Sequence, residues 1–312
     1  MSQPHDDDVT REFFLPPDSA PTEEFRRVEA PPSSTSTPSR VTSLAALFGV
    51  LAIAVAALAL PDRIGLLVAV VAIVQAGLCL IWTWVTKPEM PAGLFITGGG
   101  TAIAADLAAL LNTDQSLKAL ALVAAGGFGL AITVQLARGR ARHRVTMTLG
   151  QHVTVVMAMV GFASLPMLLR FDGGGVLAQV AVLCVGVALA CAYLLDLAIP
   201  RPAVHADVAR GLIGAGGAIL AGLICGAILL PMLADDAFNK VSFGNTVAGA
   251  LLGAVVAFVA VIADIATAYD GAVRTFRPSG FKRVVSVGFG PLLGLAVTGP
   301  ACYLVGPALL NW

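Results

Sequence analysis

Charged residues are scarce in this 312-residue chain. Asp, Glu, Lys and Arg together make up only 12% of it, hydrophobic residues make up 57%, and the mean hydropathy is +0.87. A soluble domain carries about twice that share of charge to cover its surface. The composition therefore excludes an ordinary soluble enzyme or binding module and indicates an integral membrane protein.

Several kinds of chemical site are also missing from the sequence. The five cysteines all lie inside apolar runs and form no C-x-x-C pair, so we interpret them as small packing residues and not as disulfide or zinc sites. No G-x-x-x-x-G-K-[ST], G-x-S-x-G or H-E-x-x-H motif occurs. Because 19 basic residues balance 19 acidic ones, the chain has no excess charge with which to bind nucleic acid. We expect no catalytic residue, no cofactor, no metal and no nucleic-acid partner.

Nine apolar stretches fill the chain from Val41 to Trp312. A helix needs about 20 apolar residues to cross the hydrocarbon core of a bilayer, and an open structure satisfies its backbone in lipid only as a helix. We therefore predict an all-α, polytopic transmembrane helix bundle. The expected spans are 41–60, 64–86, 91–112, 116–137, 145–169, 175–199, 211–233, 244–268 and 286–310. Because the first run begins only at Val41, we expect an uncleaved anchor and no signal peptide.

The basic residues between these spans predict the orientation. With the N-terminus inside, twelve Lys and Arg residues fall on the inner side and four on the outer side, without the tail. The inner set is Arg40, Lys87, Arg138, Arg140, Arg142, Arg144, Arg201, Arg210, Arg274, Arg277, Lys282 and Arg283, and the outer set is Arg63, Lys118, Arg170 and Lys240. Because basic residues resist translocation, we predict an N-in, C-out protein. The abundance of Ala, Val, Gly and Leu is typical of a GC-rich bacterial genome, so we expect the membrane to be a bacterial plasma membrane.

Residues 1–40 differ from the rest of the chain. They are rich in Pro, Ser and Thr and hold eight acidic residues against four basic ones. Such a segment cannot bury enough apolar surface to offset its ordering entropy, so we predict a disordered cytoplasmic tail ahead of a transmembrane domain at 41–312. Two similar elements, V-T-R-E-F-F (9–14) and P-T-E-E-F-R-R (21–27), leave two interpretations open. In the first, the tail is a solvated segment with no binding role. In the second, it docks a cytoplasmic partner and is phosphorylated at Thr10 or Thr22.

Three aspartates lie inside expected spans, where a charge is costly and marks a candidate functional site. Asp106 lies toward the outer end of 91–112, whereas Asp196 and Asp264 lie near the inner ends of their spans, at similar depth and beside basic loops. We predict a cytoplasm-facing polar pocket that binds a phosphate-bearing ligand or a lipid head group. Its candidate residues are Asp196, Asp264, Arg210, Arg274, Lys282 and Arg283. The plainer alternative is that both aspartates pair with arginines and only end their helices in the interface.

Two further patterns concern packing. The pairs Gly222/Gly226, Gly249/Gly253 and Gly290/Gly294 have G-x-x-x-G spacing, which predicts close helix–helix packing, more within the bundle than between copies. His152 follows the arginine-rich loop 138–144, and we expect its ring to snorkel toward the interface and not to bind a metal.

Three short stretches resemble motifs of a known family. R-G-L-I-G (210–214) is similar to an E-G-x-x-G at the start of a span, A-D-I (263–265) to a G-D-L, and G-P-A-C-Y-L (299–304) to an A-P-x-x-Y-L in the last span. Together they resemble the phosphatidate cytidylyltransferase, or CDP-diacylglycerol synthase, family. The resemblance covers about residues 145–310. It implies a polytopic enzyme that joins phosphatidate and CTP with magnesium at a cytoplasmic-side polar pocket, and it places Asp196 near an acidic position of the family.

The catalytic signature of that family is missing. Where it has K-D and then H-G-G-x-x-D-R-x-D, residues 281–294 read F-K-R-V-V-S-V-G-F-G-P-L-L-G, with Pro291 and Leu293 near the signature Arg and Asp. Two-metal chemistry needs several carboxylates. The resemblance therefore implies a degenerate relative that has lost nucleotidyl transfer.

These observations predict a non-enzymatic membrane protein that binds phospholipid, or a partner in lipid or envelope synthesis, through its inner face. Two alternatives stay open. One is a divergent lipid-phosphate transferase that uses Asp196 and Asp264 with Mg²⁺. The other is a small transporter in which Asp106 and Asp264 relay protons or ions along broken helices.

Overall fold

The computed structural model describes residues 47, 64–86, 88, 90–112, 116–138, 145–199, 202, 210–234, 243–273 and 289–310. The chain divides into a unit Met1–Ser34 and a unit Thr35–Trp312, and every described residue lies in the second unit. These residues form eight helices and no sheet. The helices are α2 (Ile64–Thr86), α3 (Pro91–Leu111), α4 (Lys118–Ala137), α5 (Val145–Leu168), α6 (Gly174–Ala198), α7 (Leu212–Leu233), α9 (Phe243–Val273) and α11 (Phe289–Leu310).

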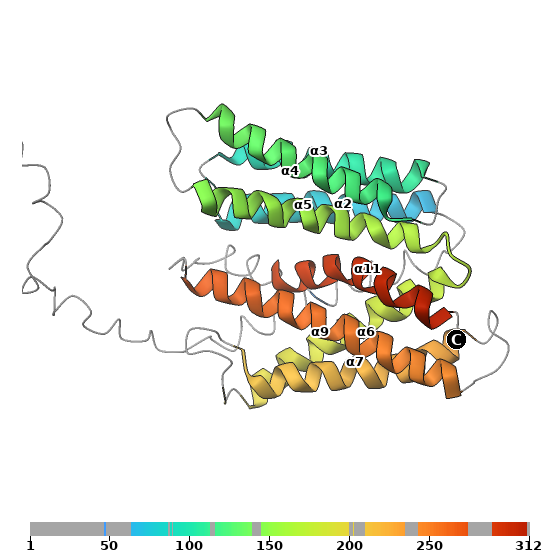
Figure 1. Ribbon diagram of the computed structural model, residues 1–312. Coiled ribbons are helices and arrows are strands. Elements are labelled where there is room, and N and C mark those ends of the chain that lie inside the picture. Colours follow the sequence, from blue (N-terminus) through green and yellow to red (C-terminus); the bar gives the residue numbers. More distant parts are fainter. Residues whose placement is uncertain are drawn as a thin grey trace, which may run out of the picture. The chain divides into compact units, whose positions relative to one another are not determined.

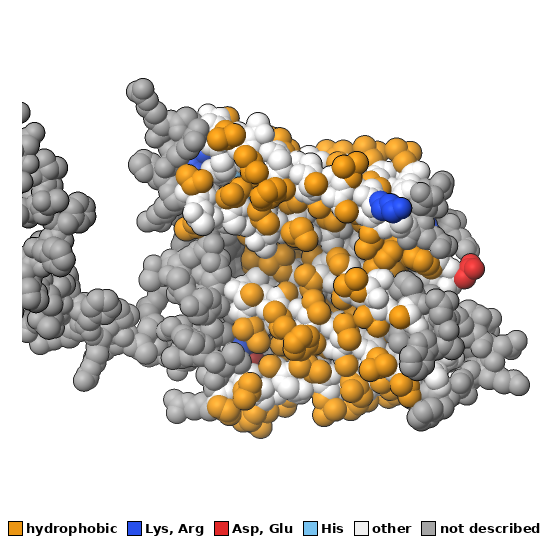
Figure 2. Space-filling model, viewed as in Figure 1, with side chains coloured by type: hydrophobic (Ala, Val, Ile, Leu, Met, Phe, Trp, Pro, Cys, Tyr) orange, Lys and Arg blue, Asp and Glu red, His pale blue; other side chains and the backbone are white. Residues whose placement is uncertain are grey.

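All eight helices are long and apolar enough to cross a membrane. The protein is therefore an all-α, multi-pass membrane protein, and eight of the nine expected spans are confirmed as helices. The expected span 41–60 lies outside the described residues except for Leu47, which is helical and buried. Large apolar side chains such as Ile73, Leu111 and Leu304 point outward, and Figure 2 shows hydrophobic side chains spread over the visible face of the helices. Lipid tails solvate such a surface without cost.

The described helices form two sets that lie side by side. Helices α2 to α5 pack on one another and make up the N-terminal set, and α6, α7, α9 and α11 pack on one another and make up the C-terminal set (Figure 1). The two sets meet chiefly through α5 and α11, with smaller contacts of α2 with α11 and of α5 with α6. Among the described helices, α3 does not contact α9.

Glycines allow the closest approach in the C-terminal set, between α7 and α9. A Cβ atom on Gly226 would collide with the carbonyl oxygen of Gly249, and one on Gly249 would collide with that of Gly226. Gly222 and Gly253 repeat the same mutual contact one turn away. Two of the predicted G-x-x-x-G pairs therefore pack against each other, which confirms packing inside the bundle.

Small residues also form the seam between the two sets. Gly161 of α5 lies against the carbonyl oxygen of Ala296 on α11, and Gly299 of α11 lies against the hydroxyl of Ser164 on α5. The Ser164 hydroxyl donates to the carbonyl oxygen of Gly161 at 2.6 Å, so it needs no partner on α11. The seam brings two backbones together without a charged side chain between these four residues.

Candidate functional site

Asp196 lies in the last turn of α6 and is 2% exposed. Its Oδ1 accepts a hydrogen bond from the backbone N–H of Gly211 at 2.9 Å, and its Oδ2 accepts one from Nη1 of Arg210 at 3.2 Å. Gly211 is the N-cap residue of α7, so the Asp196 carboxylate receives one of the N–H groups that the start of this helix leaves free. The carboxylate thus joins the end of α6 to the start of α7.

Asp264 lies in α9 and is 4% exposed. Its Oδ1 accepts a hydrogen bond from the hydroxyl of Tyr193 on α6 at 3.0 Å, and its Oδ2 forms an ion pair with Nη2 of Arg210. The Thr267 hydroxyl, one turn later, donates its hydrogen to the backbone carbonyl oxygen of Asp264 at 2.7 Å and not to the carboxylate. This second carboxylate joins α9 to the same point as α6 and α7.

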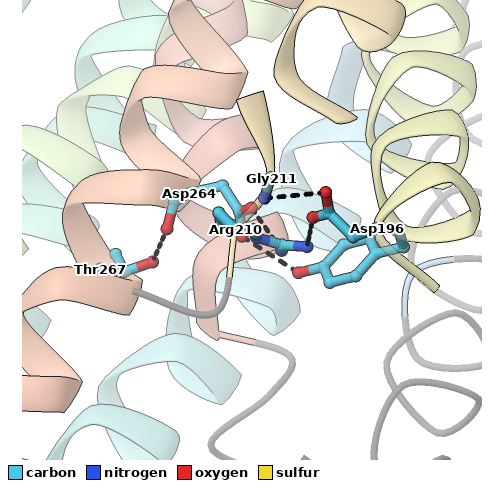
Figure 3. Close-up of polar contacts among 6 residues, drawn as sticks. Asp196, Arg210, Gly211, Asp264 and Thr267 are labelled. Atoms are coloured by element: carbon cyan, nitrogen blue, oxygen red, sulfur yellow. Dashed lines mark hydrogen bonds and ion pairs between the residues drawn. The ribbon is translucent and has the colours of Figure 1, made fainter. Parts of the chain in front are cut away.

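Arg210 lies between the two carboxylates and bridges them, as Figure 3 shows. Its guanidinium carbon also lies 3.7 Å from the ring centroid of Tyr193, which is a cation–π distance. Burial alone would lower the pKa of Arg210, but the carboxylates of Asp264 and Asp196 outweigh that effect and raise the pKa above its ordinary value. We call Tyr193, Asp196, Arg210 and Asp264 the arginine network.

Glycines make room for the two carboxylates. A Cβ on Gly211 or Gly214 of the α7 region would strike Oδ1 of Asp196, and one on Gly290 of α11 would strike Oδ1 of Asp264. All four helices of the C-terminal set therefore meet at the arginine network. Larger residues at these positions would push the carboxylates away from the guanidinium.

The structure brings together three of the six residues proposed from the sequence, namely Asp196, Arg210 and Asp264. The other three, Arg274, Lys282 and Arg283, lie outside the described residues, as do the proposed phosphorylation sites Thr10 and Thr22.

Sequence reasoning missed Tyr193 as a member of the network. It stands three residues before Asp196, a spacing that places both side chains on neighbouring parts of one helix surface, so the signal was present.

Magnesium does not fit this arrangement as it stands. Mg²⁺ takes oxygen ligands in octahedral geometry, but Arg210 already engages both Asp196 and Asp264. Within the described part of the chain, no group of three or more His, Cys, Asp or Glu side chains could hold a metal ion. With both carboxyls ionised the network holds two negative charges and one positive charge. The guanidinium of Arg210 thus supplies the positive charge that balances these carboxylates.

The remaining candidates lie in the N-terminal set. The expectation that His152 snorkels is wrong, because the side chain is 2% exposed and its Nδ1 lies 3.0 Å from Oγ1 of Thr97 on α3. Asp106 is buried on α3, and α3 does not contact α9, the helix of Asp264. A relay between Asp106 and Asp264 therefore has no direct route through these two helices.

Comparisons of the chain with models of protein families, with curated proteins and with solved structures found no match.

Proposed function

We propose that this chain is a non-catalytic membrane protein that binds phospholipid, or a partner in lipid or envelope synthesis, at the end of the C-terminal set that holds the arginine network. The single observation behind this proposal is the pairing of one buried arginine with two carboxylates at this end. Each carboxylate is satisfied by two donors within the chain. The network holds the four helices together, and charge outside it provides the affinity for a ligand.

The sequence supplies that charge in two connections that leave the network. The segment between α6 and α7 carries Arg201, and the segment between α9 and α11 carries Arg274, Arg277, Lys282 and Arg283. Basic residues at an anionic membrane surface contribute about 1 kcal/mol each. An anionic head group, or an acidic partner at the same surface, is the ligand that such segments favour.

Orientation is part of this proposal, since these segments must face the cytoplasmic leaflet of a bacterial plasma membrane. In a variant without the five native cysteines, we expect Ser116→Cys, in the α3–α4 connection, to react with a membrane-impermeant thiol reagent added to intact cells. Ala141→Cys, in the 138–144 segment, should react only after permeabilisation. Labelling in the reverse order would overturn the N-in orientation.

A second candidate is the divergent lipid-phosphate transferase. One observation favours it: Asp196, Arg210 and Asp264 come from separate stretches that the resemblance singled out, and they meet at one point. Catalysis would require Arg210 to leave at least one carboxylate so that Mg²⁺ could bind there. The chain would then hold the metal by Asp196 and Asp264 alone, and two carboxylates are too few ligands to hold Mg²⁺ against a triphosphate.

Binding and turnover distinguish the two candidates. For purified protein in mild detergent, native mass spectrometry should show retained phosphatidylglycerol in preference to phosphatidylcholine, and Arg274→Ala/Lys282→Ala/Arg283→Ala should remove that preference. Incubation with CTP, phosphatidate and Mg²⁺ should give no CDP-diacylglycerol. Equal retention of both lipids would contradict binding of anionic lipid. Turnover that Asp264→Asn abolishes would overturn the non-catalytic proposal and support the transferase.

A further inference from the structure

The N-terminal set holds a row of buried polar side chains that the proposed function does not use. Membrane helices seldom bury such groups without a role. They come from all four helices, α2 to α5, and each is at most 8% exposed. They are Gln135, Thr148, Gln151, His152, Thr97, Thr101, Gln75 and Asp106.

One end of the row lies where α4 ends and α5 begins. Nη1 of Arg138 donates to Oε1 of Gln135 at 3.0 Å and to Oγ1 of Thr148 at 3.4 Å. His152 lies one helical turn after Thr148 and therefore on the same face of α5. The first titratable side chain of the row thus lies about 6 Å along the helix from this end.

The bonds of His152 indicate which of its ring nitrogens is free to take a proton. When the Thr97 hydroxyl gives its hydrogen to the carbonyl oxygen of Gly93, 2.9 Å away, Nδ1 of His152 is the donor to Oγ1 of Thr97. In a neutral ring, Nε2 then carries the lone pair that can accept a proton. Arg138 is the charged group that faces His152 from α4.

The other end of the row contains Gln75 and Asp106. Nε2 of Gln75 donates to the carbonyl oxygen of Met159 on α5 at 2.9 Å. Met159 lies seven residues beyond His152, and Asp106 lies nine residues beyond Thr97, so both lie about 10–13 Å further along their helices. Gln75 is a polar neighbour of the Asp106 carboxyl.

Three acceptor atoms in this row have no donor. They are Oε1 of Gln75, Oδ1 of Asp106 and Oε1 of Gln151, and all three are fully buried among the described residues. An unsatisfied acceptor inside a membrane costs several kcal/mol, so water or a proton must supply the missing hydrogens.

The row extends along much of the membrane-spanning length of these helices. From Thr148 to His152, and then from Thr97 to Asp106, it covers about 20 Å of a hydrocarbon core of about 30 Å. Its two titratable groups are one carboxyl and one imidazole. A sodium ion would need a full shell of oxygen ligands, for which three free acceptors at different depths are too few.

We propose that the N-terminal set conducts protons between Asp106 and His152. The Asp106 carboxyl releases a proton to an adjacent water molecule, and its O–H bond breaks. Water beside Thr101 and Thr97 carries the proton along, and an N–H bond forms at Nε2 of His152. His152 then releases the proton toward Thr148, while Asp106 takes another proton from the opposite side. Among the described residues, the charged groups at that side are Arg170, which donates to the carbonyl oxygens of Ala109 and Leu110, and the exposed Lys118 and Asp172.

Proton flux into liposomes tests this proposal. The full chain is reconstituted with a trapped pH-sensitive dye, and a potassium gradient with valinomycin provides the driving potential. We expect acidification well above that of protein-free liposomes, and no change when choline replaces Na⁺. Asp106→Asn and His152→Gln should each reduce the flux to the protein-free level, and Asp106→Glu should retain it. Asp172→Asn, in the exposed turn between α5 and α6, is the matched control and should conduct like wild type.

The same samples are compared by gel filtration and circular dichroism, which identify a misfolded variant. If Asp106→Asn misfolds, Asp106→Glu becomes the decisive comparison. Three results would overturn the proposal. They are wild-type flux equal to that of protein-free liposomes, wild-type flux in both folded Asp106→Asn and His152→Gln, or a flux that requires Na⁺.

Discussion

Replacement of Arg210 by leucine is expected to unfold the C-terminal set at temperatures where the wild-type protein is stable. The variant leaves Asp196 and Asp264 buried without their shared cation. Removing one partner of a buried ion pair costs about 3–5 kcal/mol, which is a large share of the stability of a typical domain. The measurement is thermal unfolding of the detergent-solubilised protein, followed by gel filtration of heated samples.

Matched variants separate the loss of charge balance from the loss of the arginine side chain. The triple variant Asp196→Asn/Arg210→Leu/Asp264→Asn removes both negative charges and should recover most of the lost stability. Tyr193→Phe keeps the ring under Arg210 but removes one hydrogen bond to Asp264, so a loss of about 1–3 kcal/mol is expected. An Arg210→Leu protein as stable as wild type would show that the bridge does not hold these helices together.

Gly226→Ala is expected to destabilise the contact between α7 and α9 even though alanine is the better helix former. The added Cβ meets the carbonyl oxygen of Gly249, which is backbone and cannot rotate away. Overpacking of this kind costs about 1–3 kcal/mol, more than the gain of about 1 kcal/mol that alanine brings inside a helix. Gly226→Leu should prevent the two helices from packing.

Gly216 provides the matched control on the same helix. A Cβ on Gly216 meets nothing within 4 Å, so Gly216→Ala should be neutral or stabilising. Both variants are compared with wild type by thermal unfolding and by protease resistance in the same detergent. If Gly226→Ala raised the unfolding temperature as much as Gly216→Ala, the close approach of α7 and α9 would be wrong.

The sequence predicted the helices well because length and apolar character decide membrane helices almost without tertiary context. The ends were less certain. Helix α9 continues to Val273, beyond the expected end at residue 268, and its 31 residues are about 46 Å long, more than a bilayer core requires. The helix continues past the polar residues Tyr269 and Asp270.

The candidate site was predicted in part. Depth along the spans was enough to place Asp196 and Asp264 at one end, since both lie within four residues of the expected inner ends of their spans, residues 199 and 268. It could not show that a single arginine serves both carboxylates. The role of His152 depends on Thr97, which lies 55 residues away on another helix. The residues next to His152 in the sequence do not indicate that contact.

The position of α11 has a consequence for biogenesis. This helix follows all the other described helices along the chain, yet it supplies the α5 seam through Ala296 and Gly299 and closes over Asp264 through Gly290. A nascent chain that has not yet released α11 from the ribosome therefore has an open groove on α5 and an uncovered carboxylate on α9. Membrane quality control that detects exposed polar groups would act during this interval, so nonsense mutations ahead of α11 should be cleared more rapidly than missense changes elsewhere.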